Sequence, residues 1–201
     1  GQAWTPVTMS NLSVATWRTW KNAPTDPPDA VVQAAIDASE EAINDRCGRV
    51  FAVAGSASAR TFVPESGRSS LIEIDDCTTV TLVTNNDTTV DASAYQLEPV
   101  NGRDYAGVSV PYRRIRLLGS YWTRTYEGEA SVSVTGTWGW AALPARYLEA
   151  VKIVAADVLD AKDVRNGVIG FSDYAAIRVR DNGQVAALLQ RLTRARAGGP
   201  V

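Results

Sequence analysis

The stretch that decides the fold is DAVVQAAIDASEEAINDRCG, residues 29–48. Its apolar residues recur at spacings of three and four, which is the period of a helix with one buried face. They are Val31, Val32, Ala35, Ile36, Ala38, Ala42, Ile43 and Cys47. Pro27 and Pro28 favour the first turn of a helix, and Gly48 stands where a helix commonly ends. The pattern therefore predicts a helix over Asp29–Cys47.

The opposite face of this helix is acidic. It carries Asp37, Glu40, Glu41 and Asp45, so we expect it either to be solvated or to meet a basic partner. A shorter helix over about Ser10–Lys21 is expected before it, with Leu12, Trp17 and Trp20 on one side.

From about Phe51 to Trp140 the pattern changes to short alternating segments rich in Val, Thr, Tyr and Trp. The segments are Arg60–Val63, Leu71–Asp75, Val80–Thr84, Tyr95–Glu98, Arg113–Leu118, Tyr121–Tyr126 and Ala130–Trp138. Residues 85–87 and 118–120 are typical of hairpin loops. Gly136 and Gly139 indicate bulges or sharp bends. This region predicts a small antiparallel sheet, sandwich or barrel.

Helical periodicity returns over Pro144–Lys162. We expect a loop over Val164–Tyr174, a short strand over Ala176–Arg180, and a final helix over about Gly183–Arg194 with Asp181 and Asn182 at its start. The predicted fold class is α+β. A helical core, built from the long N-terminal helix and two C-terminal helices, carries an inserted antiparallel β-rich subdomain. The expected parts are residues 1–50, 51–140 and 141–201, the last ending in a frayed tail.

Composition narrows the function classes. The formal net charge of −2 predicts no general attraction to nucleic acid. No run of about 18 apolar residues occurs, so we expect no membrane span, and the first twenty residues lack the apolar centre of a signal peptide. The spacing of Cys47 and Cys77 matches no metal or redox motif, and Cys47 is expected to be a small buried hydrophobe.

Histidine is absent from the chain. Its absence removes Ser-His-Asp and Cys-His nucleophiles and histidine-bound zinc. Two carboxylate alternatives stay open: a calcium site at Asp75 and Asp76, and a hydrolase using Asp75, Asp76 or Glu98. Adjacent strand residues point to opposite faces, so these two aspartates make a poor catalytic pair. We expect no enzyme, no catalytic residue, no metal and no cofactor.

Two features favour contact with other proteins. Trp138 and Trp140 flank the exit from the β-region, where they either pack in a buried junction or anchor an interface. From Lys162 onward seven basic residues face three acids, whereas the middle of the first long helix is acidic. Opposite faces of this kind suit head-to-tail association of identical subunits into a ring, although a merely solvated face is the alternative. The expected subunit interface comprises Asp37, Glu40, Glu41, Asp45, Phe171, Tyr174, Arg178 and Arg180.

Three segments in a fixed order resemble the head–tail connector (adaptor) proteins of tailed bacteriophages. Residues 34–51, an alanine-rich helix followed by Cys-Gly-Arg, resemble the first long helix of that family. Residues 134–144 are similar to its exit from the β-insert, and residues 167–179 with 185–189 to its C-terminal end. The resemblance covers nearly the whole chain.

The resemblance implies a structural subunit of the virion neck that is assembled in the host cytoplasm. Such adaptors form a ring, typically dodecameric, beneath the portal protein. The ring extends the channel for double-stranded DNA, which passes without sequence readout, and it docks the downstream head-closure (stopper) or tail connector protein. Carried over to this chain, the portal-binding residues are Val185, Leu188, Leu189, Arg191, Leu192, Arg194 and Arg196. An apolar helix stripe in a partner's groove with flanking arginines is a known docking mode.

A ligand- or carbohydrate-binding module is the alternative function. It requires an exposed aromatic platform on the β-region, to which Trp122, Tyr121, Tyr126 or Tyr105 would contribute.

Overall fold

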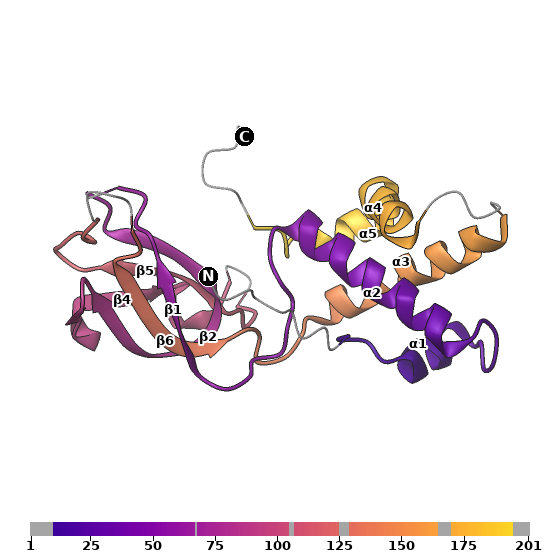
Figure 1. The fold of residues 1–201 in the computed structure, drawn as a ribbon, viewed down its shortest axis with the longest axis horizontal. Coiled ribbons are helices and arrows are strands. Elements are labelled where there is room, and N and C mark those ends of the chain that lie inside the picture. Colours follow the sequence, from indigo (N-terminus) through magenta and orange to yellow (C-terminus); the bar gives the residue numbers. More distant parts are fainter. Residues whose placement is uncertain (1–9, 67, 105–106, 125–128, 165–169, 195–201) are drawn as a thin grey trace. The chain divides into compact units, whose positions relative to one another are not determined.

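The computed structural model describes residues 10–66, 68–104, 107–124, 129–164 and 170–194 (Figure 1). The chain divides into two compact units. The helical unit comprises residues 1–50 and 143–201, and the β-unit comprises residues 51–142. Five α-helices and an antiparallel sheet confirm the predicted α+β class. Within the described ranges, no helix combines the length and the apolar character needed to cross a membrane.

Helix α2 spans Asp29–Cys47, as the sequence predicts. Gly48 ends it in the left-handed conformation, at φ 62°, where its N–H bonds back to the last turn. Helix α1 spans Val14–Lys21 and is shorter than predicted, because Ser13 caps its start by accepting from the Thr16 N–H. Trp17 of α1 is buried, and its indole N–H donates to the carbonyl of Lys152 over 3.3 Å.

The C-terminal part contains three helices, α3 (Ala145–Val164), α4 (Phe171–Asp181) and α5 (Gly183–Leu189). The expected strand over Ala176–Arg180 is wrong, because this segment is helical throughout. The short apolar alternation there fits the period of a strand as well as that of a helix. Ala175 and Val179, which are four residues apart, are both buried because α4 packs against α2 and α3. The expected loop is correspondingly shorter, and residues 165–169 of it lie outside the described residues. Helix α5 ends earlier than predicted, followed by a turn.

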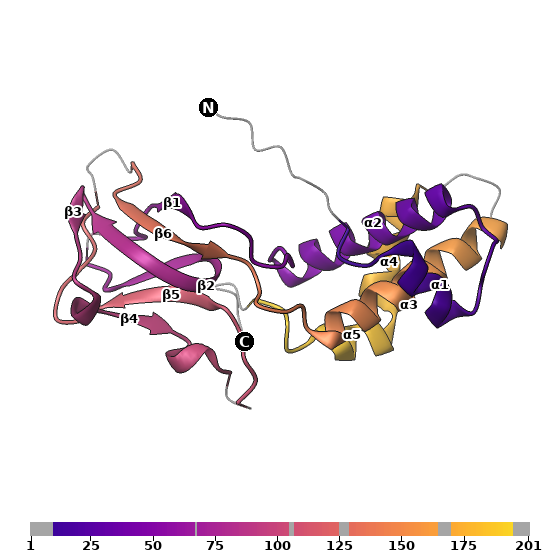
Figure 2. The ribbon, with the colours of Figure 1, turned by 90° about the horizontal axis from the view of Figure 1, so that it is seen from below.

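The β-unit is built on one sheet with strand order β1-β6-β2-β5-β4, with β3 beside β2. The strands are β1 (Ser58–Phe62), β2 (Leu71–Asn85), β3 (Thr88–Thr89), β4 (Tyr95–Glu98), β5 (Tyr112–Leu117) and β6 (Val132–Trp138). Figure 2 shows β1 and β6 on one side of this unit, β5 and β4 on the other, and β2 between them. All strand pairs are antiparallel.

Two predicted strands, Leu71–Asp75 and Val80–Thr84, are halves of the single long strand β2. Its first half pairs with β5 and its second half with β6, and the register shifts near Cys77. The register also shifts between Val80 and Leu82, and such irregularities bend a strand. The predicted turn at residues 85–87 is confirmed as the β2–β3 hairpin, since Asn86 and Asp87 have φ values of 50° and 60°.

The expected strand Tyr121–Tyr126 does not form in its described part, residues 121–124. Trp122 is fully buried, and its backbone N–H donates to the carbonyl of Ser69 rather than to a neighbouring strand. Residues 118–120 are therefore a bend that leaves β5, and not a hairpin. Residues 125 and 126 lie outside the described residues.

Entry to and exit from the β-unit are joined by backbone hydrogen bonds. The Ala54 N–H donates to Trp140 O and the Trp140 N–H donates to Ala52 O, both over 2.8 Å. Phe51 stacks on Trp140 with ring centroids 5.5 Å apart. Trp138 is also buried, and its indole N–H donates to Ser58 O over 2.8 Å. The two exit tryptophans are therefore buried, Trp138 in the core of the β-unit and Trp140 against Phe51.

Both cysteines are free and buried, which confirms the expectation for Cys47. Burial raises the pKa of both thiols, that of Cys77 to about 11. They are thus small core residues and weak nucleophiles at neutral pH.

Candidate assembly surfaces

The solvent side of α2 carries a stripe of three exposed carboxylates, Asp37, Glu41 and Asp45. Asp37 accepts a hydrogen bond from the side-chain amide of Gln33 over 2.8 Å. For Glu41 and Asp45, the described part of the chain offers no ion-pair partner. This acidic stripe, as we name these three residues, is available to another chain.

Glu40 does not belong to this surface, which corrects the expectation that it is a subunit-interface residue. It is only 8% exposed. Its carboxylate accepts the backbone N–H groups of Asn11 and Leu12 over 2.9 and 3.1 Å, and the Ser10 hydroxyl lies 3.4 Å away. Burial raises the pKa of Glu40, although these hydrogen bonds act in the opposite direction. Consecutive helix residues point about 100° apart, so Glu40 faces the N-terminal segment while Glu41 faces solvent.

Residues 10–12 form a strap across the helical unit that sequence reasoning missed. The side-chain amide of Asn11 also donates to the hydroxyl of Tyr147 on α3 over 3.1 Å. Tyr147 is fully buried, which raises its pKa, and the nearby Glu40 raises it further. The partners are 29 and 136 residues apart in the chain, so no local pattern could have revealed them.

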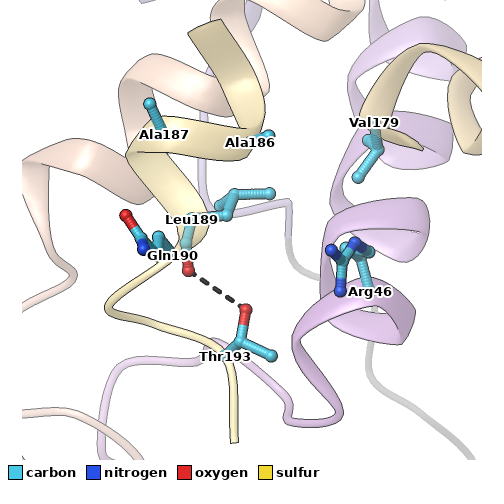
Figure 3. A pocket seen from close by; sticks show the side chains of 7 residues that line it. All are labelled: Arg46, Val179, Ala186, Ala187, Leu189, Gln190 and Thr193. Atoms are coloured by element: carbon cyan, nitrogen blue, oxygen red, sulfur yellow. Dashed lines mark hydrogen bonds between the residues drawn. The ribbon is translucent and has the colours of Figure 1, made fainter. Parts of the chain in front are cut away.

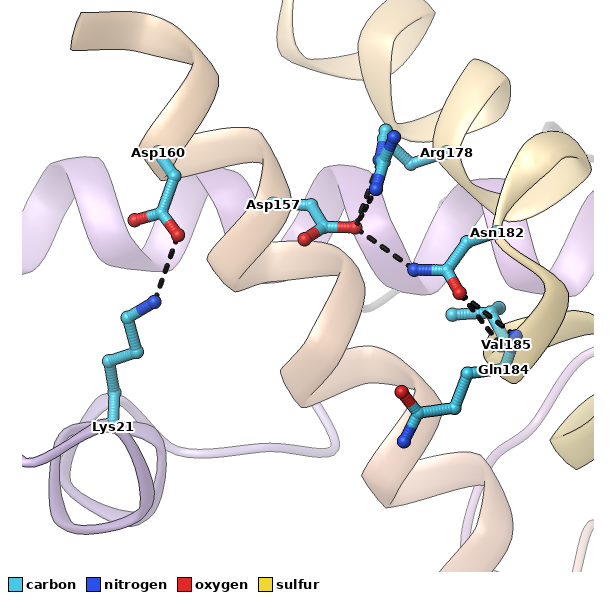
Figure 4. Close-up of polar contacts among 7 residues, drawn as sticks. All are labelled: Lys21, Asp157, Asp160, Arg178, Asn182, Gln184 and Val185. Carbon is cyan, nitrogen blue, oxygen red and sulfur yellow. Dashed lines mark hydrogen bonds and ion pairs between the residues drawn. The ribbon is translucent and has the colours of Figure 1, made fainter.

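Arg178, expected at the subunit interface, is held within its own chain. Its guanidinium donates to Asp157 of α3 through Nε and Nη2 over 2.9 and 2.8 Å, which raises its pKa (Figure 4). Asn182 also donates to Asp157, over 3.1 Å, and its carbonyl accepts the N–H groups of Gln184 and Val185 at the start of α5. One carboxylate therefore joins α3, α4 and the cap of α5.

The other α4 residues of the expected interface differ in exposure. Arg180 is exposed and pairs with Asp181 over 2.7 Å, whereas Phe171 and Tyr174 are half-buried. Arg178 and Arg180 thus both have acidic partners in this chain, which leaves them poorer candidates for pairing with another subunit.

The apolar stripe of α5 and of the turn that follows it is not an open docking face, which corrects that expectation. Val185, Leu189 and Leu192 are at most 7% exposed, because they close the core of the helical unit. Leu188 and Arg194 are half-buried and Arg191 is exposed, whereas Arg196 lies outside the described residues.

A groove of about 460 Å³ lies where the C-terminal ends of α2 and α4 meet α5 (Figure 3). Val179, Ala186, Ala187 and Leu189 form its apolar wall, and Arg46, Gln190 and Thr193 supply its polar groups. The Thr193 hydroxyl donates to the carbonyl of Leu189 over 3.1 Å. We call this feature the Arg46 groove.

Two hydrogen bonds to backbone carbonyls join the segment after α5 to the end of α2. The Arg194 N–H donates to the carbonyl of Cys47 over 2.8 Å, and the Arg49 guanidinium donates to the carbonyl of Leu192 over 3.2 Å. Four arginines, at positions 46, 49, 191 and 194, are thereby gathered at one end of the helical unit.

The aromatic platform of the alternative function is contradicted at its largest ring, because Trp122 is fully buried. Tyr121 is 59% exposed, and Tyr105 and Tyr126 lie outside the described residues. Among the described residues, Trp122 is therefore removed from such a platform and Tyr121 is left.

The carboxylates considered for chemistry are separated or paired. Asp76 is buried, whereas Asp75 is exposed and pairs with Arg60 over 2.6 Å. Glu98 pairs with Arg116, also over 2.6 Å. Within the described residues, no three Cys, Asp or Glu side chains gather in a way that could hold a metal ion.

The fold of this helical unit and its inserted sheet is shared by chains of gene transfer agent particles. A chain in the neck of an empty gene transfer agent particle, computed with C6 symmetry, matches with a TM-score of 0.57 and 23% identity. A chain in the virion of the native gene transfer agent particle matches with the same score and 22% identity. Each match covers 98% of this chain and 96% of the other. No protein-family model matches the sequence, and no curated protein matches it.

Proposed function

We propose that this chain is a structural subunit of the neck of a tailed-phage-like particle, where it acts as a head–tail connector. The observation that carries the proposal is the likeness to a chain of a gene transfer agent neck over 98% of this chain. The match therefore includes both the helical unit and the β-unit. In this role the chain belongs to the virion, is assembled in the host cytoplasm, and works by packing against other proteins without a catalytic step.

The proposed assembly is a ring of identical subunits, with twelve copies as the expected number. The C6 symmetry of the related neck is compatible with a ring of six or twelve copies. Genomic DNA would pass through the lumen without sequence readout. The formal net charge of −2 supports this, because a strongly basic lumen would bind phosphates and hold the DNA.

We propose that the C-terminal end of the helical unit meets the portal protein. The buried residues Val185, Leu189 and Leu192 would fix the end of α5, and the contact itself would come from its exposed and half-buried side chains. These are Leu188, Arg191 and Arg194, with Arg196 beyond them. The downstream stopper or tail connector would dock on the opposite side of the ring.

The proposal is tested by measuring the size and shape of the particles that this chain forms, alone and with the portal protein of the same particle. Light scattering after gel filtration and negative-stain microscopy are expected to detect a ring, alone or on the portal. A chain that stays monomeric and never binds the portal would contradict the proposal.

A further inference from the structure

Arg46 is the cation of the Arg46 groove. It lies in the last turn of α2 and is exposed, and its side chain faces Thr193 and Leu189 across the groove (Figure 3). Among the residues that the structure describes, no carboxylate pairs with Arg46. An exposed guanidinium beside an apolar wall suits an acidic side chain that arrives together with an aliphatic surface.

The acidic stripe lies on a different side of the same helix. Asp37, Glu41 and Asp45 follow one another at four-residue spacing, so they line one side of α2. At about 100° per residue, Arg46 points roughly 140° away from Glu41, the middle of the stripe. Like charges at this spacing repel one another, and a cationic partner would relieve that repulsion.

We propose that the Arg46 groove of one copy receives the acidic stripe of a second copy, with Arg46 pairing with Glu41 or Asp45. This inference rests on the proposed ring function and identifies the surfaces that join its subunits. Because the two surfaces face different sides of α2, the contact is head-to-tail, and repetition gives a closed ring or an open filament rather than a twofold dimer.

Charge complementarity identifies the occupant. The arginines at positions 49 and 194 lie at the same end of the helical unit as Arg46. The α4 arginines make the weaker alternative, since Asp157 and Asp181 already neutralise them.

Zero-length cross-linking tests the pairing directly in the full chain. An Arg46→Lys variant labelled with ¹⁵N is mixed with unlabelled Arg46→Lys protein and treated with a carbodiimide, which joins an amine to a carboxylate in contact. We expect a mixed-isotope peptide that links position 46 to Glu41 or Asp45. The ion pair of Lys21 with Asp160, at 2.9 Å within one chain, is the internal control for the chemistry.

Association is then measured by sedimentation velocity with and without the portal protein. Arg46→Glu is expected to lower the association constant between copies at least tenfold. Adding Glu41→Arg to this variant is expected to restore part of the association. Arg146→Glu is the matched control, because Arg146 is an exposed arginine on the first turn of α3 and is not one of the residues that line the groove.

The outcomes separate this inference from the proposed function. Rings that persist in Arg46→Glu, with links from position 46 only to other acids, would overturn the inference and leave the neck role standing. A chain that neither associates nor links between copies, even with portal present, would overturn both. Loss of rings in Arg46→Glu and recovery in the charge swap would support both.

Discussion

The carboxylate of Glu40 holds the strap that leads into α1. It accepts hydrogen bonds from the backbone N–H groups of Asn11 and Leu12, and Leu12 is only 3% exposed. Removing the acceptor would leave buried donors without a partner, and this costs more than the hydrogen bonds contribute net. The strap is therefore expected to be sensitive to this one residue.

We predict that Glu40→Ala lowers the free energy of unfolding by about 2 kcal/mol, whereas Glu40→Gln, which keeps an acceptor oxygen, lowers it by about 1 kcal/mol. Glu41→Ala is the matched control, since Glu41 is exposed and its loss should change stability by less than about 0.5 kcal/mol. Urea unfolding of the three variants measures the differences. Equal effects at positions 40 and 41 would contradict the strap.

The raised pKa of Glu40 predicts a pH dependence. The folded state binds this proton more tightly than the unfolded state, so Glu40 favours folding most at low pH, and its contribution falls as pH rises from near 4.5 through the raised pKa. Glu40→Gln lacks this titration. Its stability relative to the wild-type chain should therefore improve with rising pH across that window, as urea unfolding at several pH values would measure. A constant difference would contradict the prediction.

At the scale of secondary-structure elements, β6 crosses β2 at its bulge with no room for a side chain. A Cβ on Gly136 would clash with the carbonyl oxygen of Thr79 and would lie 2.8 Å from the sulfur of Cys77. Because a backbone atom is the nearest neighbour, the strands themselves would have to separate.

We predict that Gly136→Ala lowers the free energy of unfolding by about 2 kcal/mol or more, through overpacking at this crossing. Gly55→Ala is the control, because a Cβ there would meet nothing within 4 Å. Denaturant unfolding monitored by tryptophan fluorescence compares them. An unchanged Gly136→Ala variant would mean that the two strands are further apart than described.

The elements differ in how far local sequence predicts them. Helix α2 could be bounded because Pro28 and Gly48 act within a turn of their own positions. Helix α4 could not be predicted in this way, because its five residues of apolar alternation are also typical of a strand. Only the packing of α4 on α2 and α3 selects the helix. Of the candidate interface, exposure of Asp37 and Asp45 followed from periodicity, whereas the internal pairing of Arg178 required Asp157 from another helix.

At the scale of the whole molecule, the β-unit has its own hydrophobic core, centred on Ile115, Trp122 and Val134. Its two ends are joined by the paired backbone of Ala52 and Trp140. A unit with its own core and adjacent ends should fold independently of the segment into which it is inserted.

We predict that a fragment of residues 51–142 folds on its own. Circular dichroism should give a β-sheet spectrum with a cooperative urea transition. The same fragment carrying Gly136→Ala is the control, since its transition should shift to lower urea. A fragment without a cooperative transition would show that the helical unit is required.

The sequence by itself determined the α+β class, the bounds of α2, the hairpin at Asn86 and the absence of histidine chemistry. These properties depend on composition or on residues within a few positions of one another. Only the tertiary structure decided that β2 is a single bent strand, that α4 is a helix, that Glu40 faces inward and that Arg46 faces a groove. Each of these depends on a partner that is distant in the chain and becomes a neighbour only when the core closes.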